Sequence, residues 1–385
     1  FKNLNNNDPW NRLNDQPTIQ RVILSWDITV SKNKAANDGG QMLKGRVFSQ
    51  EYNSIVNENA NFTSPKFYIL SEAGYQYKVD FYDTDPWGFP LSCNNLGLTD
   101  ANKQPIYKSL KQVDYQRSVD PNSWLPGKTY LYEPQAKEKA PFVNNKVFFN
   151  LPDPDMPSSA QVTDVFRNET YTTWLFNQPQ ASGPALNDVK FTPGNPNGNG
   201  CPPGFFKEGD GGIFTFDINT TGSITLLLDL NNDGDFNDAV DKLYFLPVLG
   251  GKDTIYWDGK YGNGTVVSAQ KNYIFSYKVI FRTGEIHILM ADIENNPGGV
   301  TLTRINGPNY PDNTFYYDHS SIGGPVSGGG TVGNASATSI PFSYSNNFGN
   351  EKMLDYWSYV EVFKTGAATF NIEKECKNLY PDSDG

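Results

Sequence analysis

The chain has 385 residues, of which 19% are charged and 14% aromatic, and its formal net charge is -11. Such a negative charge excludes nucleic acid and anionic membrane surfaces as partners, because phosphate binding depends on clustered Lys and Arg. The length accommodates two domains, and 35 glycines with 26 prolines favour many short strands joined by turns. No apolar run reaches the roughly 18 residues of a membrane-spanning helix, so we expect no membrane insertion.

Residues 1–18 are rich in Asn, Asp and Pro, and we expect a linker there. From residue 19 onward, segments rich in β-branched and aromatic side chains alternate with turn signals, which favours strands. These segments lie at 21–30, 45–56, 66–83, 128–134 and 146–152. They predict a first β module over 19–155, because the stretch 150–160 concentrates Pro, Ser and Asp and indicates a boundary.

A second β-rich block predicts a second β-sandwich module over 156–372. Its expected strands lie at 212–218, 223–230, 242–249, 272–282, 285–294, 300–305 and 356–364. A Gly- and Ser-rich stretch at 320–339 predicts a long surface loop between the last two strands. Helical periodicity is weak throughout, so the fold class we predict is all-β, with tandem sandwich modules, immunoglobulin-like or jelly-roll-like, and long loops.

The segment YDTDPWGFP at 82–90 combines aromatic, acidic and turn-forming residues. On a loop, Tyr82, Asp85 and Trp87 would form a ligand site in which aromatic rings stack on sugar rings and the carboxylate accepts bonds from hydroxyls. The alternative is an aromatic loop that packs over the end of a sheet, since Trp and Tyr bury much apolar area. An exposed aromatic patch would favour the ligand site.

Side-chain oxygens recur at alternate positions between the expected strands 223–230 and 242–249. The candidate metal ligands are Asp229, Asn231, Asp233, Asp235, Asn237, Asp238 and Asp241. Gly234 takes the sixth place, where an EF-type calcium loop turns sharply, but Val240 stands where such a loop has its bidentate Glu. We expect a structural Ca²⁺ that neutralises these oxygens and stiffens the loop, with a plain polar hairpin loop as the alternative.

Beyond this loop, the segments TIYWDGKYGNGTVV (254–267) and FRTGEIHILMADIENNPGGVTLTRING (281–307) carry a resemblance. They resemble the immunoglobulin-type β modules of large secreted surface proteins of the Bacteroidota, including gliding-motility and type IX secretion-associated adhesins. The ending YPDSDG at 380–385 resembles the opening of a thrombospondin type 3-like calcium stalk, so 373–385 is expected to be the start of a stalk or a linker. The triplet at 253–255 resembles a short O-glycosylation motif of exported Bacteroidota proteins, which implicates Thr254.

The resemblance implies a secreted, extracellular or cell-surface attached protein without enzymatic activity. It also implies as partners the other domains of a longer surface protein, a surface polysaccharide, or secretion and anchoring machinery. A chain that begins at Phe1 and ends in PDSDG agrees with a processed or partial piece of a longer protein.

The residues that usually carry catalysis are few. Cys93, Cys201 and Cys376 lie far apart, which leaves open one disulfide with a free thiol or three thiols. His287 and His319 are the only histidines, and nucleophile elbow, phosphate-binding and zinc motifs are absent from the sequence. The sequence therefore favours a non-enzymatic module for adhesion or surface fibre architecture. A carbohydrate-binding module of a secreted multidomain protein is the alternative, and a hydrolase with paired carboxylates is a third hypothesis.

Overall fold

A computed structural model gives the fold of the chain. It describes residues 30–31, 42–50, 52–56, 62–85, 87–100, 103–111, 115–117, 130–132, 142–164, 169–194, 206–323, 335–336, 342–344 and 347–375. This part of the chain is built from strands, with one short 3-10 helix, η3 (Ser320–Ile322). The all-β sandwich prediction is confirmed. The predicted linker 1–18, most of the loop 320–339 and the end of the predicted stalk lie outside the described residues.

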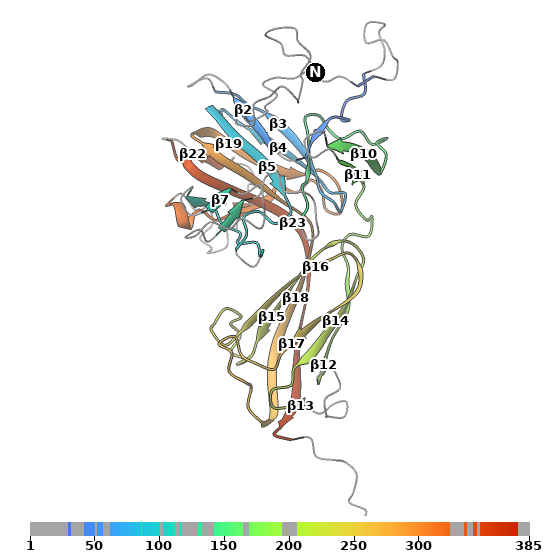
Figure 1. Cartoon of the computed structure of the whole chain (residues 1–385), viewed down its shortest axis with the longest axis vertical. Helices are drawn as coiled ribbons and strands as arrows, with labels where there is room; N and C mark the ends of the chain where they lie inside the picture. The colour runs from blue at the N-terminus through green and yellow to red at the C-terminus, as the bar shows by residue number, and fades with distance from the viewer. Residues whose placement is uncertain are drawn as a thin grey trace, which may run out of the picture.

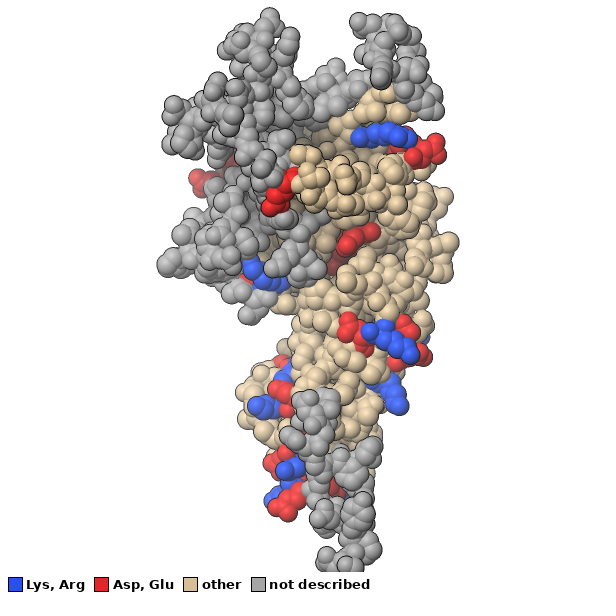
Figure 2. Space-filling view, turned by 45° about the vertical axis from the view of Figure 1, so that its right-hand side comes forward, with Lys and Arg blue, Asp and Glu red and all other residues tan. Residues whose placement is uncertain are grey.

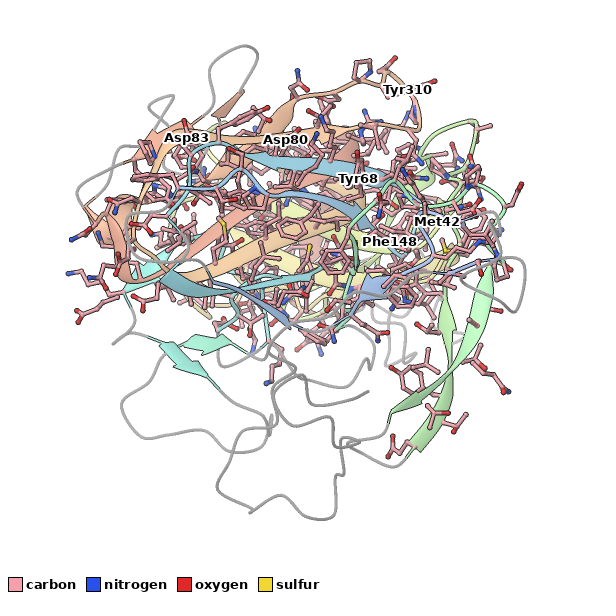
Figure 3. The ribbon with its side chains drawn as sticks, turned by 90° about the horizontal axis from the view of Figure 1, so that it is seen from above. Met42, Tyr68, Asp80, Asp83, Phe148 and Tyr310 are labelled. Atoms are coloured by element: carbon pink, nitrogen blue, oxygen red, sulfur yellow. The ribbon has the colours of Figure 1, made fainter. Side chains whose placement is uncertain are left out.

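The molecule is elongated, with an upper half and a lower half that meet at a narrow waist (Figure 1). In the described part, the outer layer of the upper half is a six-stranded sheet. Its order is β1 (Phe48–Ser49), β9 (Lys146–Phe148), β3 (Lys66–Leu70), β4 (Gln76–Phe81), β19 (Asn296–Arg304) and β22 (Phe342–Tyr344). Figure 3 looks down on this half and labels Tyr68, Asp80 and Phe148, which lie on β3, β4 and β9.

A ten-stranded sheet contributes to both halves. Its main path runs β16 (Lys242–Val248), β15 (Gly222–Asp229), β18 (Gln270–Ile293), β23 (Gly349–Glu373), β20 (Thr314–Tyr317) and β21 (Ala335–Ser336). Off this path lie β2 (Tyr52–Val56), β5 (Trp87–Asn94), β6 (Leu110–Lys111) and β13 (Phe206–Lys207).

Three smaller sheets complete the described strands. The lower half has a three-stranded sheet of β12 (Leu186–Pro193), β14 (Gly212–Ile218) and β17 (Gly251–Trp257). The pairs are β10 (Ser159–Asp164) with β11 (Glu169–Trp174), and β7 (Tyr115–Arg117) with β8 (Tyr130–Tyr132). Strand β14 shows why such segments form sandwiches: its residues alternate between buried and partly buried, so one face packs on the core.

The central feature is the ribbon, which we define as the antiparallel pair β18 and β23. Its register runs from Gln270 opposite Ile372 to Ile293 opposite Gly349. Phe275, Val279 and Phe281 of β18 belong to the lower core, whereas Ile286, Ile288 and Met290 belong to the upper core. Two strands thus supply both sandwiches.

The sequence predicts two separate strands at 272–282 and 285–294, whereas the structure has one strand with an irregular register between Thr283 and Ile286. Gly284 has φ 62° there, and a Cβ at this position would lie 2.3 Å from Cδ2 of Tyr75. The sequence of Thr283 and Gly284 indicates a turn. The two residues instead form a bulge, because the segments on both sides of them continue to pair with β23.

A single boundary near residue 155 does not separate the two cores. The upper core contains Phe67 through Val147 from before that position, and Ile286 through Trp357 from after it. The lower core draws on residues between Leu186 and Ile372. Composition marks where the chain leaves one half, but it does not show that β18, β19, β20 and β23 return to it.

Candidate functional site

The acidic loop, defined as residues 229–241, connects the neighbouring antiparallel strands β15 and β16. Strands flank it on both sides, as the sequence predicts. Asp229 and Asp241 stand at its two ends, and both are buried. The carboxylates at the two ends of the loop are therefore buried.

Backbone amides satisfy these two buried carboxylates. Asp229 accepts hydrogen bonds from the amides of Asp233, at 3.1 Å, and Gly234, at 3.0 Å. Asp241 accepts from the amide of Leu230 at 3.0 Å. Burial, together with the nearby charges of Asp238 and Asp229, raises the pKa of Asp241 above its ordinary value, although backbone bonds oppose the shift. The charged form of Asp241 is therefore disfavoured despite these hydrogen bonds.

The predicted ligands form two groups within the loop. Nδ2 of Asn231 donates to Asp233 Oδ2 at 2.9 Å and to Asp238 Oδ2 at 2.8 Å, so this amide lies between two carboxylates. Asp235 and Asn237 bond to each other on the exposed side, with Asn237 Nδ2 3.1 Å from Asp235 Oδ1. Among the described residues, no three His, Cys, Asp or Glu side chains gather closely enough to be recognised as a metal site.

The structure separates the residues predicted to bind a sugar. Tyr82 is 39% exposed, and its hydroxyl lies 3.4 Å from Oγ1 of Thr301. Asp85 is 4% exposed, and its amide donates to the carbonyl of Asn295 at 3.0 Å. Trp87 begins β5, opposite Val56, and its side chain lies outside the described part. Because Asp85 is buried, its carboxylate does not accompany Tyr82 at the surface.

The other residues singled out from the sequence lie at separate positions. Thr254 lies exposed on β17, and its amide donates to Oδ1 of Asp253 at 2.8 Å. Cys93 is a buried free thiol, and burial raises its pKa. Cys201 and Cys376 lie outside the described residues, so the pairing stays open.

Sequence reasoning missed a group of buried and partly buried residues at the waist, the junction cluster, which consists of Tyr107, Arg282, Glu285, His287 and Asp355. Nδ1 of His287 lies 2.8 Å from Oδ1 of Asp355, and its Nε2 lies 3.4 Å from Oε1 of Glu285. Burial opposes a charge on the imidazole, but the two carboxylates prevail and raise the pKa of His287 to about 9. Nη1 of Arg282 donates a hydrogen bond to the hydroxyl of Tyr107 at 3.3 Å.

The sequence does carry a signal for this cluster. Glu285 and His287 are two residues apart within the apolar strand EIHILM, so both point to the same face. Two ionisable groups on one face of a buried strand indicate a partner on the neighbouring strand. That partner, Asp355, is identified only by the pairing of β18 with β23.

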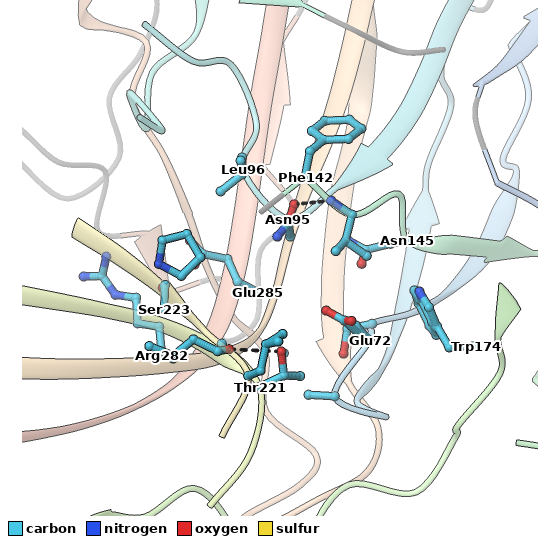
Figure 4. A pocket seen from close by; sticks show the side chains of 18 of the residues that line it. Glu72, Asn95, Leu96, Phe142, Asn145, Trp174, Thr221, Ser223, Arg282 and Glu285 are labelled. Atoms are coloured by element: carbon cyan, nitrogen blue, oxygen red, sulfur yellow. Dashed lines mark hydrogen bonds between the residues drawn. The ribbon is translucent and has the colours of Figure 1, made fainter. Parts of the chain in front are cut away.

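Beside the junction cluster lies a cavity of about 470 Å³, which we call the waist cavity. Its walls come from the upper half, the lower half and the ribbon. In Figure 4, Glu72 and Trp174 lie on one side, whereas Ser223 and Arg282 lie on the other. Asn95 and Asn145 also line it. The waist cavity is therefore assembled from segments far apart in the chain.

No family model, curated protein or solved structure matches the chain. Within the described residues, no helix combines the length and the apolar character needed to cross a membrane. On the face shown in Figure 2, acidic and basic side chains of the lower half lie intermixed.

Proposed function

We propose that this chain is a non-enzymatic module of a longer secreted protein, attached to the cell surface, where it serves adhesion or the architecture of a surface fibre. The ribbon is the observation that carries the proposal. It pairs β18 with β23 through both cores, and after the bulge between Thr283 and Ile286 the pairing resumes on the other side of the waist. A protein that transmits tension between two points needs such a continuous connection.

The direction of the ribbon supports this role. Strand β2 lies in the upper half, and β23 ends at Glu373 in the lower half (Figure 1). Tension along the long axis therefore acts along the strands of the ribbon. Because ladder hydrogen bonds stand perpendicular to antiparallel strands, this tension loads many bonds together. Tension across the sheet would open them one after another.

Calcium enters the proposal as a structural ligand of the acidic loop. Five carboxylates lie within 229–241, and the raised pKa of Asp241 indicates that its charged form is disfavoured by burial and by neighbouring charge. A divalent cation with oxygen ligands would offset that charge. The resemblance of 254–267 and 281–307 to Bacteroidota surface modules supports the secreted setting. It also supports other domains of a longer protein, a surface polysaccharide or anchoring machinery as partners.

Single-molecule force measurements on the whole chain test the mechanical role. One sample is held by its two ends. The other is held through cysteines introduced by Leu243→Cys and Phe363→Cys, at exposed positions on β16 and β23. These strands are separated by β15 and β18 in one sheet, so the second geometry pulls across the ladders. We expect a several-fold higher unfolding force when the chain is held by its ends.

Equal unfolding forces in the two geometries would overturn the proposal. The double variant held by its ends is the control, and it should unfold at the same force as the unsubstituted chain. Antibody labelling of intact source cells tests the location separately, and labelling only after lysis would contradict a surface role.

A further inference from the structure

The waist cavity contains polar groups that the protein itself leaves unpaired. Asn145 is 1% exposed and Ser223 is 7% exposed, and both residues line the cavity. Oδ1 of Asn145 and Oγ of Ser223 have no hydrogen-bond partner within the described protein. Buried polar atoms are rarely left in this state, because they lose their bonds to water without gaining others. Both atoms are covered in the present side-chain arrangement, so a ligand in the cavity bonds to them once the two side chains turn toward it.

Carboxylates add further acceptors to the cavity wall. Glu285 lines it, and its Oε1 faces Nε2 of His287 at 3.4 Å without the alignment of a hydrogen bond. Glu72 stands on the side of Trp174 (Figure 4). The wall also contains the cation Arg282, which forms an ion pair with Glu361, with Nε 2.9 Å from Oε2. This arrangement disfavours an anionic ligand and favours one with several hydroxyl donors.

Aromatic rings supply an apolar wall. Trp174 and Phe142 both line the cavity and are partly buried. Nζ of Lys146 lies 3.9 Å from the centroid of the Trp174 ring, and Lys146 is not part of the cavity wall. One face of the indole is thus covered, so the cavity meets its other face or its edge. An aromatic surface beside hydroxyl acceptors suits a molecule with an apolar face and a polar rim.

We propose that the waist cavity binds a short neutral saccharide of one or two rings. Its hydroxyls donate to the carboxylates of Glu72 and Glu285, and they bond to Asn145 Oδ1 and Ser223 Oγ when these two side chains turn toward the cavity. The apolar face of a ring packs on Trp174. A cavity of about 470 Å³ falls in the range of about 300 to 1,000 Å³ typical of small-ligand sites. A compact amine is less suited, because Glu285 already faces the imidazole of His287 and the guanidinium of Arg282 also lines the cavity.

The saccharide would be the molecule to which a surface module adheres, so this inference rests on the proposed function for its setting. The binding itself is separable from the acidic loop. Ser223 lies near the start of β15 and Asp229 at its end, which places the cavity and the loop at opposite ends of one strand. The binding test measures affinity without load, whereas the force test measures the resistance of the ribbon to pulling, so each can fail without the other.

Isothermal titration calorimetry on the whole chain tests the inference. The probes are glucose, galactose, mannose and xylose, together with their neutral β-linked disaccharides. Digalacturonic acid and putrescine serve as the anionic and cationic arms. We expect saturable binding of at least one neutral saccharide. We also expect Trp174→Ala to weaken it by at least about tenfold, and Ser223→Ala to weaken it while the melting temperature stays close to that of the unsubstituted chain.

Phe176→Ala is the matched control. Phe176 is an exposed aromatic residue two positions beyond Trp174, and it does not line the cavity; this variant should bind normally. The inference is overturned if none of the neutral saccharides binds. Binding of only the acid or only the amine overturns it as well. Binding that survives Trp174→Ala and Ser223→Ala would place the saccharide elsewhere and also overturn the inference.

Discussion

His287 owes its charge to the residues around it. Asp355 faces it from β23 and Glu285 from β18, and the rings of Tyr107 and Trp357 lie beside it, with centroids 5.3 Å and 5.8 Å away. The imidazole has no exposed surface, so the solvent screens these charges little. An isolated buried histidine would be neutral, whereas two carboxylates hold this one protonated.

This environment predicts how stability depends on pH. The pKa of His287 is raised from 6.5 to about 9 in the folded chain. Its contribution is therefore complete below about pH 6.5 and disappears as the pH rises through 9. A shift of this size corresponds to on the order of 3 kcal/mol. Urea unfolding of the chain and of His287→Gln, followed from pH 6 to 10, should show a difference in free energy that shrinks toward pH 10. A difference independent of pH would contradict this account.

Asp233 allows the calcium hypothesis to be tested at a single side chain. Its Oδ2 accepts from Asn231 and its Oδ1 accepts from the amide of Asp235, so it lies within the acidic loop rather than at its buried ends. We expect calcium to raise the melting temperature of the chain, an excess of chelator to remove this gain, and Asp233→Ala to abolish it.

Asp217→Ala is the control for this measurement, since it removes a carboxylate from β14, outside the loop, and should keep the calcium response. Identical melting with calcium and with chelator would instead show that the hydrogen bonds of the loop are sufficient, and the loop would be a plain polar hairpin.

Among the elements, the ribbon has three irregularities in its register, and Gly284 lies in the central one, between Thr283 and Ile286. Gly284 has φ 62° and lies against the ring of Tyr75, so a side chain there meets both backbone strain and a clash. Gly323 has a similar φ of 71° with open space around it. We expect Gly284→Ala to lower the free energy of unfolding by roughly 2 kcal/mol or more, and Gly323→Ala to cost clearly less. Urea unfolding of both variants compares the two costs, and equal costs would show that the contact with Tyr75 is unimportant.

Local patterns in the sequence predict the elements better than their partners. The segment 212–218 is predicted as a strand, and β14 has these bounds. The predicted strand 66–83 is instead the hairpin of β3 and β4, because Gly74, with φ 83°, supplies a turn that the surrounding aromatic residues obscure. The acidic loop is visible in sequence since its residues are contiguous. The waist cavity is not, because Glu72, Trp174 and Ser223 meet only after distant strands have paired.

At the scale of the whole molecule, the two halves share the ribbon but differ in how much of the chain each needs to complete its core. All buried residues of the lower core lie between 186 and 372, whereas the upper core needs residues from 67 to 147 as well. A fragment that begins at residue 156 therefore retains a complete lower sandwich. It lacks β3, β4, β5 and β9, which cover the upper part of the ribbon.

Hydrogen exchange on such a fragment, 156–375, tests this dependence. We expect the amides of 273–281 to remain protected, because their core is intact. The amides of 286–293 should exchange much faster than in the full chain, because Ile286, Ile288 and Met290 have lost most of the layer that covers them, of which only β19 and β22 remain. The lower segment is the internal control for folding of the fragment. Full protection of both segments would mean that the upper part of the ribbon is stable without most of its outer sheet, and that the halves fold as modules in sequence order.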